Sequence, residues 1–521
     1  MMKLPDRIDE ALLERLARRV TVTGEDRELL DIEAPYTGET FGTLPMGTAD
    51  DVSEAARQAR AAQQSWSKQS FRERARIFLR FHDLIFQRKD EILDLIQLET
   101  GKARNHAYEE IGDAAIVARY YAFNARKHLK SRKRKGIYPI LTATREQHAP
   151  VGLVGFITPW NYPLTLGITD AIAALMAGNG ALLKPDRQTP FTALWAVDLL
   201  YQAGLPADLL QVVVGKGSVL GQPIIESVDY LAFTGSTGTG RLLAAATGEK
   251  LIGCTMELGG KNPMVILDDA NLSRAARVAV WDCFSSTGQL CVSIERILIQ
   301  STIYDEFVRL FAEETQSLKL GASFDYSADI GSLISAEQLE KVRSHVEDAV
   351  MKGAKVAAGG RPRPELGPYF YEPTILENVT EEMALFAEET FGPVVSLYRF
   401  ESIDEAVEKS NSSTYGLHAS IWTRDTARGR RVASGLKAGT VSINDTYRST
   451  WGSIDAPMGG FKDSGLGRRH GATGIVKYTE SQTVTVQRLL QVGPPRGMSE
   501  ERFHNFLTRG IKLLRRIPGL R

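Results

Sequence analysis

Cys291 is the side chain in this sequence with the clearest capacity for covalent chemistry. It ends the segment 286–291 (STGQLC), where a helical pattern breaks at Gly288 and Gln289, so its thiol can be presented to a cleft. Glu257 opens the segment ELGGK and offers a carboxylate. A thiolate and a carboxylate held close together can form a covalent intermediate and then hydrolyse it. Because a lone cysteine is more often a packing residue, this hypothesis depends on the other segments.

Two further segments place polar side chains at the ends of predicted strands. Asn161, in PWNYP, follows the strand 151–157, and a neutral, directional amide at that point is a good oxyanion donor. Lys184 and Arg187 follow the strand 181–183. A lysine there can bond ribose hydroxyls, and two cations three residues apart can hold a phosphate. Each segment taken alone would be an ordinary turn or a solvated loop.

Two more segments complete the candidate site. FTGSTGTG contains Gly235, Ser236 and Gly240 between a strand and a helix, where glycines let backbone N–H groups approach a pyrophosphate. Its spacing differs from G-x-G-x-x-G, so alone it is a moderate signal. EETFGPV supplies the carboxylate of Glu389 and the ring of Phe391, in what would otherwise be a helix end leading into a Gly-Pro turn.

The elements that must position these residues alternate between helix and strand. After a helical stretch over residues 49–121, short apolar strands alternate with helices, which predicts a parallel, doubly wound α/β sheet. Such a sheet commonly binds a dinucleotide at the carboxyl ends of its strands. A second α/β alternation begins at residue 263, so the candidate catalytic residues lie on either side of a domain junction and the site should occupy an interdomain cleft. Within the first alternation we expect helices over 168–177 and 191–203 and after Gly240.

Bulk properties exclude several classes of protein. The 521 residues carry 63 basic and 63 acidic side chains, so no net charge favours nucleic-acid binding. Three cysteines in so long a chain argue against a disulfide framework and for a reducing compartment. The N-terminus lacks the apolar core of a signal peptide, and no apolar stretch is long enough to span a bilayer. We therefore expect a cytoplasmic protein without a metal site.

The C-terminal tail, residues 491–521, has the pattern of a basic amphipathic helix. One face carries the apolar residues Phe503, Phe506, Leu507, Leu514 and Ile517. The arginines lie largely on other faces: Arg502, Arg509, Arg515 and Arg516. Such a helix can lie on a membrane surface, although packing on the body or on a neighbouring subunit is the favoured interpretation.

Taken in order, the segments PWNYP, LLKP, FTGSTGTG, ELGGKNP, GQLC and EETFGPV resemble those of the aldehyde dehydrogenase superfamily, from about residue 25 to about residue 485. The resemblance implies a dinucleotide-binding domain from residues 1–130 and 151–260 and a catalytic domain from 261–474. It also implies oligomerisation strands at 131–150 and 475–490, ahead of the tail, and a homodimer or homotetramer.

The resemblance assigns roles residue by residue. Cys291 is the nucleophile, Asn161 and the backbone N–H of Cys291 form the oxyanion hole, and Glu257 activates the water that hydrolyses the thioester. Because Glu257 is present, the expected product is a free carboxylate. The implied cofactor contacts come from Thr158, Trp160, Lys184, Arg187, Gly235, Ser236, Gly240, Glu389 and Phe391. A non-catalytic relative or a cofactor-independent hydrolase is the alternative class.

The C-terminal motifs are similar to a bacterial branch assigned as NADP-dependent succinate-semialdehyde dehydrogenases. Better-studied members of that activity have arginines for the substrate carboxylate at the positions of Thr169 and Ser285, so here Arg448 or Arg104 would have to replace them. The alternative is a broad aliphatic or aromatic aldehyde. The residues expected to line the substrate tunnel are Tyr162, Thr165, Leu290, Val292 and Trp451.

Arg187 decides the expected cofactor. NAD-specific relatives usually have a glutamate at this position, which would repel a 2′-phosphate, whereas the guanidinium of Arg187 suits a phosphate and lies beside Lys184. We therefore expect NADP, with NAD possible as a second cofactor. Asp186 is an adjacent carboxylate that would oppose this unless it faces away.

Overall fold

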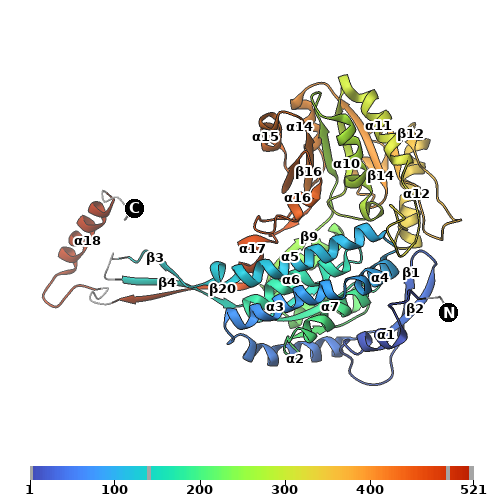
Figure 1. The fold of residues 1–521 in the computed structure, drawn as a ribbon. Helices are drawn as coiled ribbons and strands as arrows, with labels where there is room; N and C mark the ends of the chain where they lie inside the picture. Colours follow the sequence, from blue (N-terminus) through green and yellow to red (C-terminus); the bar gives the residue numbers. More distant parts are fainter. Residues whose placement is uncertain (1–3, 138–141, 488–492, 516–521) are drawn as a thin grey trace.

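The computed structural model describes residues 4–137, 142–487 and 493–515. Figure 1 shows two α/β bodies, with a slender β arm and a terminal helix extending away from the first of them. The expected architecture of two α/β units with a small β extension is thereby confirmed.

A six-stranded sheet organises the first body, in the order β19-β9-β8-β5-β6-β7. Its strands are β5 (Leu153–Ile157), β6 (Gly180–Lys184), β7 (Leu210–Val212), β8 (Tyr230–Thr234), β9 (Gly253–Glu257) and β19 (Gly465–Leu466). Strands β5 to β9 are parallel, and β19 adds an antiparallel edge. The strand order reverses between β5 and β8, which is where sheets of this kind bind ligands.

Alternating side chains along each strand fill two separate cores in the first body. Val154 and Phe156 of β5 face one apolar cluster, whereas Leu153 and Ile157 face the other. The first cluster receives α1 (Glu10–Ala17), α3 (Phe71–Gln87), α4 (Lys89–Thr100), α5 (Arg104–Leu129), α6 (Pro163–Ala177) and α7 (Pro190–Gln202). The second receives α2 (Ala49–Trp66), α8 (Gly217–Ser227) and α9 (Thr237–Lys250). The hairpin β1 (Leu29–Ala34) and β2 (Glu39–Pro45) packs at the edge of the first cluster.

The second body contains a seven-stranded sheet in the order β12-β13-β14-β11-β10-β16-β17. Its strands are β10 (Asn262–Ile266), β11 (Ile294–Gln300), β12 (Lys355–Ala358), β13 (Thr374–Glu377), β14 (Val394–Phe400), β16 (His418–Trp422) and β17 (Thr440–Ile443). Among them only β12 pairs antiparallel. The helices are α10 (Leu272–Phe284), α11 (Tyr304–Gln316), α12 (Ala336–Met351), α13 (Ala384–Ala387), α14 (Ile403–Asn411), α15 (Thr426–Gly435) and α16 (Tyr447–Trp451).

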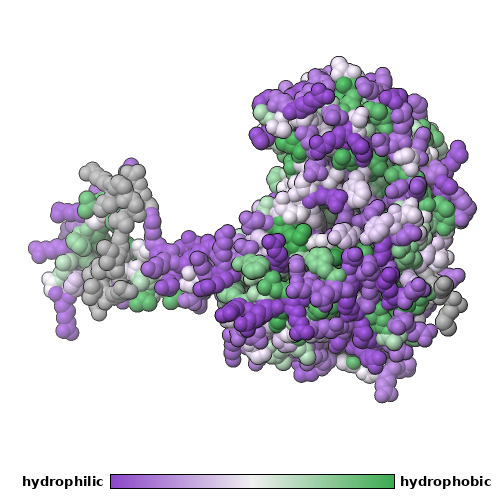
Figure 2. All heavy atoms as spheres, in the orientation of Figure 1, coloured by the Kyte–Doolittle hydropathy of each residue, from purple (hydrophilic) through white to green (hydrophobic). Residues whose placement is uncertain are grey.

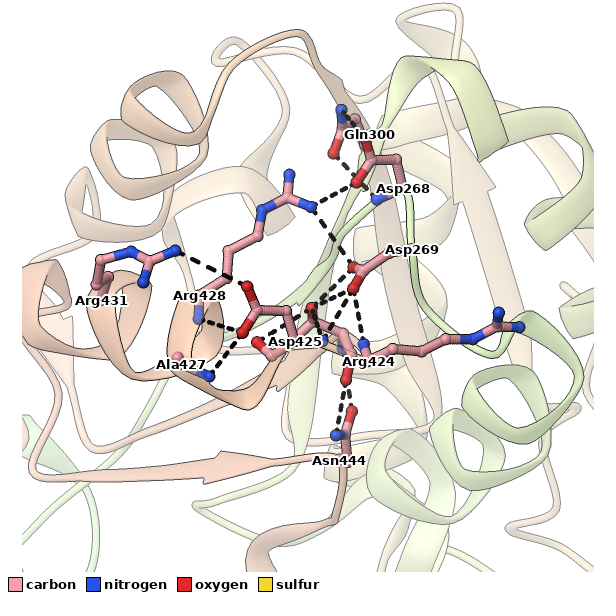
Figure 3. A network of polar contacts seen from close by, with 10 residues as sticks. Asp268, Asp269, Gln300, Arg424, Asp425, Ala427, Arg428, Arg431 and Asn444 are labelled. Carbon is pink, nitrogen blue, oxygen red and sulfur yellow. Dashed lines mark hydrogen bonds and ion pairs between the residues drawn. The ribbon is translucent and has the colours of Figure 1, made fainter.

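A polar network fixes the carboxyl ends of the central strands β10 and β16 (Figure 3). Asp269 accepts hydrogen bonds from the Thr423 hydroxyl at 2.7 Å and from the backbone N–H of Arg424 at 2.9 Å. Asp425 caps α15, and Arg428 on that helix reaches back to Asp268 at 2.6 Å. The network lies at the opposite edge of the sheet from Cys291, so it stabilises the scaffold rather than the candidate site.

The arm is an antiparallel sheet in the order β20-β4-β3, made of β3 (Arg132–Arg134), β4 (Thr142–Pro150) and β20 (Thr479–Gln487). Figure 2 shows it standing away from the body, with mostly hydrophilic residues on the visible face. Beyond it, α18 (Glu500–Leu514) buries Phe503 but exposes Phe506 and Leu513. Ile517 and Arg516, placed on this helix by the sequence pattern, lie outside the described residues. No helix in the described ranges is long and apolar enough to cross a membrane.

Three boundaries differ from the sequence-based expectations. Helix α6 begins at Pro163, five residues early, because proline suits the first turn and the buried Glu110 accepts the N–H groups of Leu164 and Thr165. Helix α9 begins before Gly240, because Ser236 caps it. Strand β19 returns to the first sheet, although the sequence placed residues 261–474 together in the second domain.

Candidate active site

The candidate site lies where the strand ends of the first sheet face the strand ends of the second. Asn161, Lys184 and Glu257 follow or end β5, β6 and β9, at the carboxyl ends of the first sheet. Cys291 precedes β11, and the loop containing Glu389 precedes β14, at the amino ends of the second sheet. The fold therefore brings together segments that are far apart in the sequence, as the cleft hypothesis expects.

A left-handed turn presents Cys291. After α10, Ser286, Thr287 and Gly288 have φ values of 51°, 59° and 70°. A Cβ on Gly288 would lie 2.0 Å from the carbonyl oxygen of Gly392, so only glycine fits against the neighbouring loop. The break between helix and cysteine seen in the sequence is thus a turn with no room for a side chain.

Cys291 lines two cavities at once. One has a volume of about 210 Å³ and the other about 230 Å³, and both include Cys291 and Leu166 in their walls. Burial, together with the nearby carboxylates of Glu389 and Glu257, raises the pKa of the Cys291 thiol to about 12. The free thiol is therefore neutral at pH 7, and its ionisation requires a base or a positive charge nearby.

Glu257 has the properties of a proton acceptor near neutral pH. It ends β9, is 6% exposed and lines the second cavity. Its Oε1 atom has no hydrogen-bond partner among the residues that the structure describes. Burial raises the pKa of Glu257 to about 7, against the attraction of Arg469 and Lys477. At pH 7 about half of these carboxyl groups can accept a proton.

The basic partners of Glu257 were missed by the sequence reasoning. Arg469 is 1% exposed and forms an ion pair of 3.2 Å with Asp170, and Lys477 lies 3.8 Å from the same carboxylate. Asp170 lies on α6 and the two cations flank or end α17 (Gly471–Val476), so the cluster depends on a contact across the fold. The motif GLGRRHG contained the arginine, but nothing in it indicated this burial.

The Asn161 amide lies against the loop that carries the cysteine. Its Nδ2 atom donates a hydrogen bond of 3.0 Å to the carbonyl oxygen of Gln289, two residues before Cys291. An amide nitrogen has two hydrogens, so a second donor is available for an oxygen close to the sulfur. The side chain is 3% exposed and so is largely shielded from water.

A larger polar groove of about 570 Å³ continues from the second cavity, and both are lined by Pro159, Trp160, Thr234, Gly235 and Ser236. The predicted cofactor residues Thr158, Lys184 and Arg187 also line the groove. Ser236 caps α9, whose N-terminus therefore faces the groove. Gly240 is not in the lining: it lies in the first turn of α9, where a Cβ would approach Leu258 to 2.4 Å. Its role is close packing.

Three cations line the groove. Lys184 is buried, whereas Arg187 and the unpredicted Lys216, at the start of α8, are exposed and form no ion pair with any described residue. Asp186 accepts a hydrogen bond from the N–H of Gln188 at 3.0 Å, so its carboxylate is engaged by its own turn. The groove therefore fits a dinucleotide that carries an extra phosphate.

The loop with Glu389 and Phe391 is held by buried side chains of the second domain. Glu295 accepts the N–H groups of Thr390 and Phe391, each at 2.9 Å, and pairs with Lys261 at 2.5 Å. Phe391 contacts Trp160 edge to face, with ring centroids 5.5 Å apart. Glu389 accepts the Gly260 N–H at 2.7 Å, and burial raises the pKa of Glu389 to about 7. Both residues line the second cavity.

The first cavity agrees with the predicted tunnel except at one position. Its lining includes Tyr162, Thr165, Leu290 and Trp451, together with Tyr108, Ile116, Glu109 and Arg448. Val292 is only 1% exposed and is absent from the lining, because it is packed inside the apolar cluster that also contains Tyr162 and Leu290. Arg104 is bound to Asp94 and Gln97 in another part of the fold. Arg448 is thus the arginine that the cavity offers.

Glu109 is an acidic residue inside this apolar cavity, and burial raises the pKa of its carboxyl although several polar groups contact it. It accepts hydrogen bonds from the Tyr447 hydroxyl at 3.0 Å and the Trp281 indole at 3.2 Å, and Arg448 lies 3.4 Å away. The side chain of Arg448 is 56% exposed and also contacts the Trp281 ring. Its remaining donors can bind a substrate anion at the cavity mouth.

The arrangement can support a reaction on a small apolar molecule beside a phosphate-bearing cofactor. A thiol lies between the two cavities, with an amide donor and a carboxyl of suitable pKa in the same walls. No group of three or more His, Cys, Asp or Glu that could hold a metal ion occurs in the described part of the chain.

Comparison with known proteins agrees with this chemistry. The sequence matches the aldehyde dehydrogenase family over residues 21–484. It is 50% identical over 506 residues to a Mycolicibacterium smegmatis protein named "putative succinate-semialdehyde dehydrogenase, NADP(+)", with 97% of this chain and 98% of that protein covered. It is 36% identical over 473 residues to mitochondrial succinate-semialdehyde dehydrogenase of Oryza sativa subsp. japonica, with 90% and 88% covered.

The fold has solved counterparts. Betaine aldehyde dehydrogenase from Staphylococcus aureus, in complex with NAD+, superimposes with a TM-score of 0.87 at 32% identity, covering 92% of this chain and 97% of that one. The family match extends over nearly the whole chain and includes every segment that forms the site. The chain belongs to the aldehyde dehydrogenase family.

Proposed function

We propose that this chain oxidises succinate semialdehyde to succinate, with NADP as the hydride acceptor. The position of Cys291 carries the proposal, because its side chain lines both the apolar cavity and the cavity that continues into the polar groove. An aldehyde entering from one side and a nicotinamide entering from the other would meet at the sulfur. The names of the relatives from M. smegmatis and O. sativa support the substrate, and the first of them supports NADP.

The residues have separate tasks in this reaction. Cys291 Sγ adds to the carbonyl carbon, and the second amide hydrogen of Asn161, with the backbone N–H of Cys291, stabilises the resulting oxyanion. The bound cofactor supplies the hydride acceptor. Loss of hydride leaves a thioester on Cys291, which water attacks while Glu257 takes the water's proton. The carbon–sulfur bond then breaks, and the carboxylic acid leaves.

Variants of the two proposed catalytic residues test this division of labour. Cys291→Ala should abolish aldehyde oxidation while leaving the NADP dissociation constant unchanged, because only the nucleophile is lost. Glu257→Gln should slow hydrolysis of the thioester more than its formation, and so give a burst of reduced cofactor followed by slow turnover. The amide cannot accept the water's proton, whereas for acylation the lost base is partly offset, because the Glu257 charge that raises the pKa of the Cys291 thiol is lost as well. Stopped-flow absorbance at the reduced-nicotinamide wavelength measures both. Turnover retained by Cys291→Ala, or an unchanged steady state in Glu257→Gln, would contradict the assignment.

The same base sets a pH dependence. Because burial raises the pKa of Glu257 to about 7, hydrolysis of the thioester should rise with pH through about 7 and level off above it. Single-turnover experiments on the acylated enzyme would show this as a sigmoidal profile, and the profile should be absent in Glu257→Gln.

The preference for NADP should depend on the exposed cations of the groove. Arg187→Glu should weaken NADP binding by about 1–3 kcal/mol and affect NAD far less, because a charge-assisted contact to the 2′-phosphate is lost. Lys216→Glu should act in the same direction. Arg80→Glu, on the exposed face of α3, makes the same change in net charge and should leave the ratio intact. Steady-state kinetics with both cofactors measure the ratio of kcat/KM for NADP to that for NAD. If this ratio is unchanged in both groove variants, Arg187 and Lys216 do not bind the 2′-phosphate.

Binding of the substrate carboxylate should depend on Arg448. Arg448→Gln should lower kcat/KM for succinate semialdehyde about tenfold, and leave butanal, which has the same chain length, nearly unchanged. The apolar lining of the cavity instead favours a broad aldehyde specificity. A wild-type enzyme that oxidises butanal as efficiently as succinate semialdehyde would establish that alternative.

We further propose that copies of this chain associate through the arm. Strand β20 is exposed over nearly its whole length, with Val484 and Val486 37% and 55% exposed, and a small sheet without a covering layer is only marginally stable. The double variant Val484→Glu/Val486→Glu should reduce the mass of the protein in solution towards the 57.4 kDa of one chain, as measured by light scattering. Leu29→Glu, at an exposed strand position on the body, is the control. An unchanged mass in the arm variant would place the interface elsewhere.

A further inference from the structure

The turn after α4 makes an unusually close contact between the two bodies. Gly101 ends α4 with φ at 68°, and its carbonyl oxygen accepts a hydrogen bond from the Ser332 N–H at 2.9 Å. A Cβ on Gly101 would lie 2.0 Å from Ser332 Oγ, and one on Gly331 would lie 1.9 Å from the Gly101 oxygen. The backbones of the two domains therefore touch here with no side chain between them.

The second-domain side of this contact holds the loop that presents Cys291. The Thr287 hydroxyl donates to the Gly331 carbonyl oxygen at 3.2 Å. The Gln289 side-chain oxygen accepts the Ile334 N–H at 3.0 Å. Both residues lie just before the cysteine, Thr287 in the left-handed turn and Gln289 after it, so the segment 331–334 fixes this stretch relative to Gly101.

The first-domain side is continued by Lys102, which adjoins Gly101 and is buried. Its ammonium group lies 2.8 Å from Glu110 Oε1 and donates a hydrogen bond of 2.5 Å to the carbonyl oxygen of Asn161. It also lies 3.8 Å from the centre of the Tyr162 ring. The second oxygen of Glu110 accepts the first free N–H groups of α6, from Leu164 at 2.8 Å. The ion pair thus holds the Asn161 loop at two points: Lys102 binds the Asn161 carbonyl oxygen, and Glu110 binds the N-terminus of α6, which follows the loop.

These contacts close a ring across the domain boundary. It runs from Lys102 to Asn161, from the Asn161 amide to the Gln289 carbonyl at 3.0 Å, and back through the segment 331–334 to Gly101. A charged lysine buried at this point has no contact with either cavity in the described structure. Its bonds are all directed at the backbone and side chains that aim the amide.

We propose that Lys102 is a positioning residue that holds the Asn161 amide in register with Cys291, through the buried Lys102–Glu110 pair. The inference rests on the proposed role of Asn161 as oxyanion donor. Removing Lys102 should therefore reduce the acylation rate only by displacing the Asn161 amide, and should have little effect when that amide is absent.

A double-mutant cycle tests the inference, with the burst rate of cofactor reduction as the measure of acylation. Asn161→Ala should lower this rate about 100- to 1000-fold, which is typical for the loss of one oxyanion donor. Lys102→Met should lower it by more than about tenfold in the wild-type background, but by less than about threefold in the Asn161→Ala background. The NADP dissociation constant and the rate of Cys291 alkylation by iodoacetamide should stay unchanged, since neither needs the oxyanion donor.

Lys261→Met is the matched control, because Lys261 is equally buried and pairs with Glu295, away from Asn161. The fold-reductions of the burst rate caused by Lys261→Met and by Asn161→Ala should multiply in the double variant, because the two side chains act independently. Should Lys102→Met fail to fold because Glu110 is left as an unpaired buried carboxyl, the cycle is run with Lys102→Met/Glu110→Gln, whose amide oxygen can still accept from α6.

The outcomes separate the inference from the proposed function. An acylation rate that Asn161→Ala leaves intact would overturn the oxyanion role of Asn161 and the inference with it. A large effect of Asn161→Ala that multiplies fully with Lys102→Met, or with the paired variant, would overturn only the positioning role. Equal non-additivity for Lys261→Met would do the same, because the coupling would then not be specific to Lys102.

Discussion

The structure depends on one close backbone contact, the left-handed turn 286–288 packed against Gly392. The turn has space for no Cβ at Gly288, and it directs the chain from the end of α10 to the start of β11 with Cys291 between the two cavities. A thiol on a regular helix or strand would face one side only. Thr287 in this turn bonds Gly331, the Asn161 amide bonds Gln289 directly after the turn, and Glu295 bonds Phe391 directly before Gly392. The turn is therefore surrounded by the contacts that position the site.

The same packing buries the carboxyl groups of the site, and this burial governs their electrostatics. Burial raises the pKa values of Glu257 and Glu389 to about 7, although opposite charges lie near both. For Glu257 the opposition comes from Arg469 and Lys477, which share Asp170 as a partner. The cluster therefore holds the carboxyl close to the midpoint of its titration. A fully solvated carboxyl would be too weak a base at pH 7, and an unopposed buried one would remain protonated.

How far the sequence predicted this structure depended on the range of the interactions. The predicted strand 151–157 and helix 191–203 lie within two residues of the observed β5 and α7, because local apolar patterns define them. Residues within recognisable motifs, such as Asn161 and Glu257, were also predicted to meet. Lys102, Lys216 and Arg469 were not, because their roles arise from contacts with segments distant in the chain. The prediction for Val292 was wrong for a related reason: Val292 and Leu290 pack in the same apolar cluster, but only Leu290 reaches the cavity, and that difference depends on contacts with distant segments.

The buried charges also limit how Cys291 can become a nucleophile. Losing its proton to bulk water would place a new negative charge beside the carboxyls of Glu257 and Glu389, and both already raise the pKa of the thiol. Moving the proton from Sγ to an ionised Glu257 keeps the number of buried negative charges constant, so it avoids that penalty. Glu257 must then lose this proton before water attacks the thioester, because only the ionised carboxylate can accept the proton of the attacking water. A carboxyl with a pKa near 7 can do both, since neither of its protonation states is strongly favoured at neutral pH.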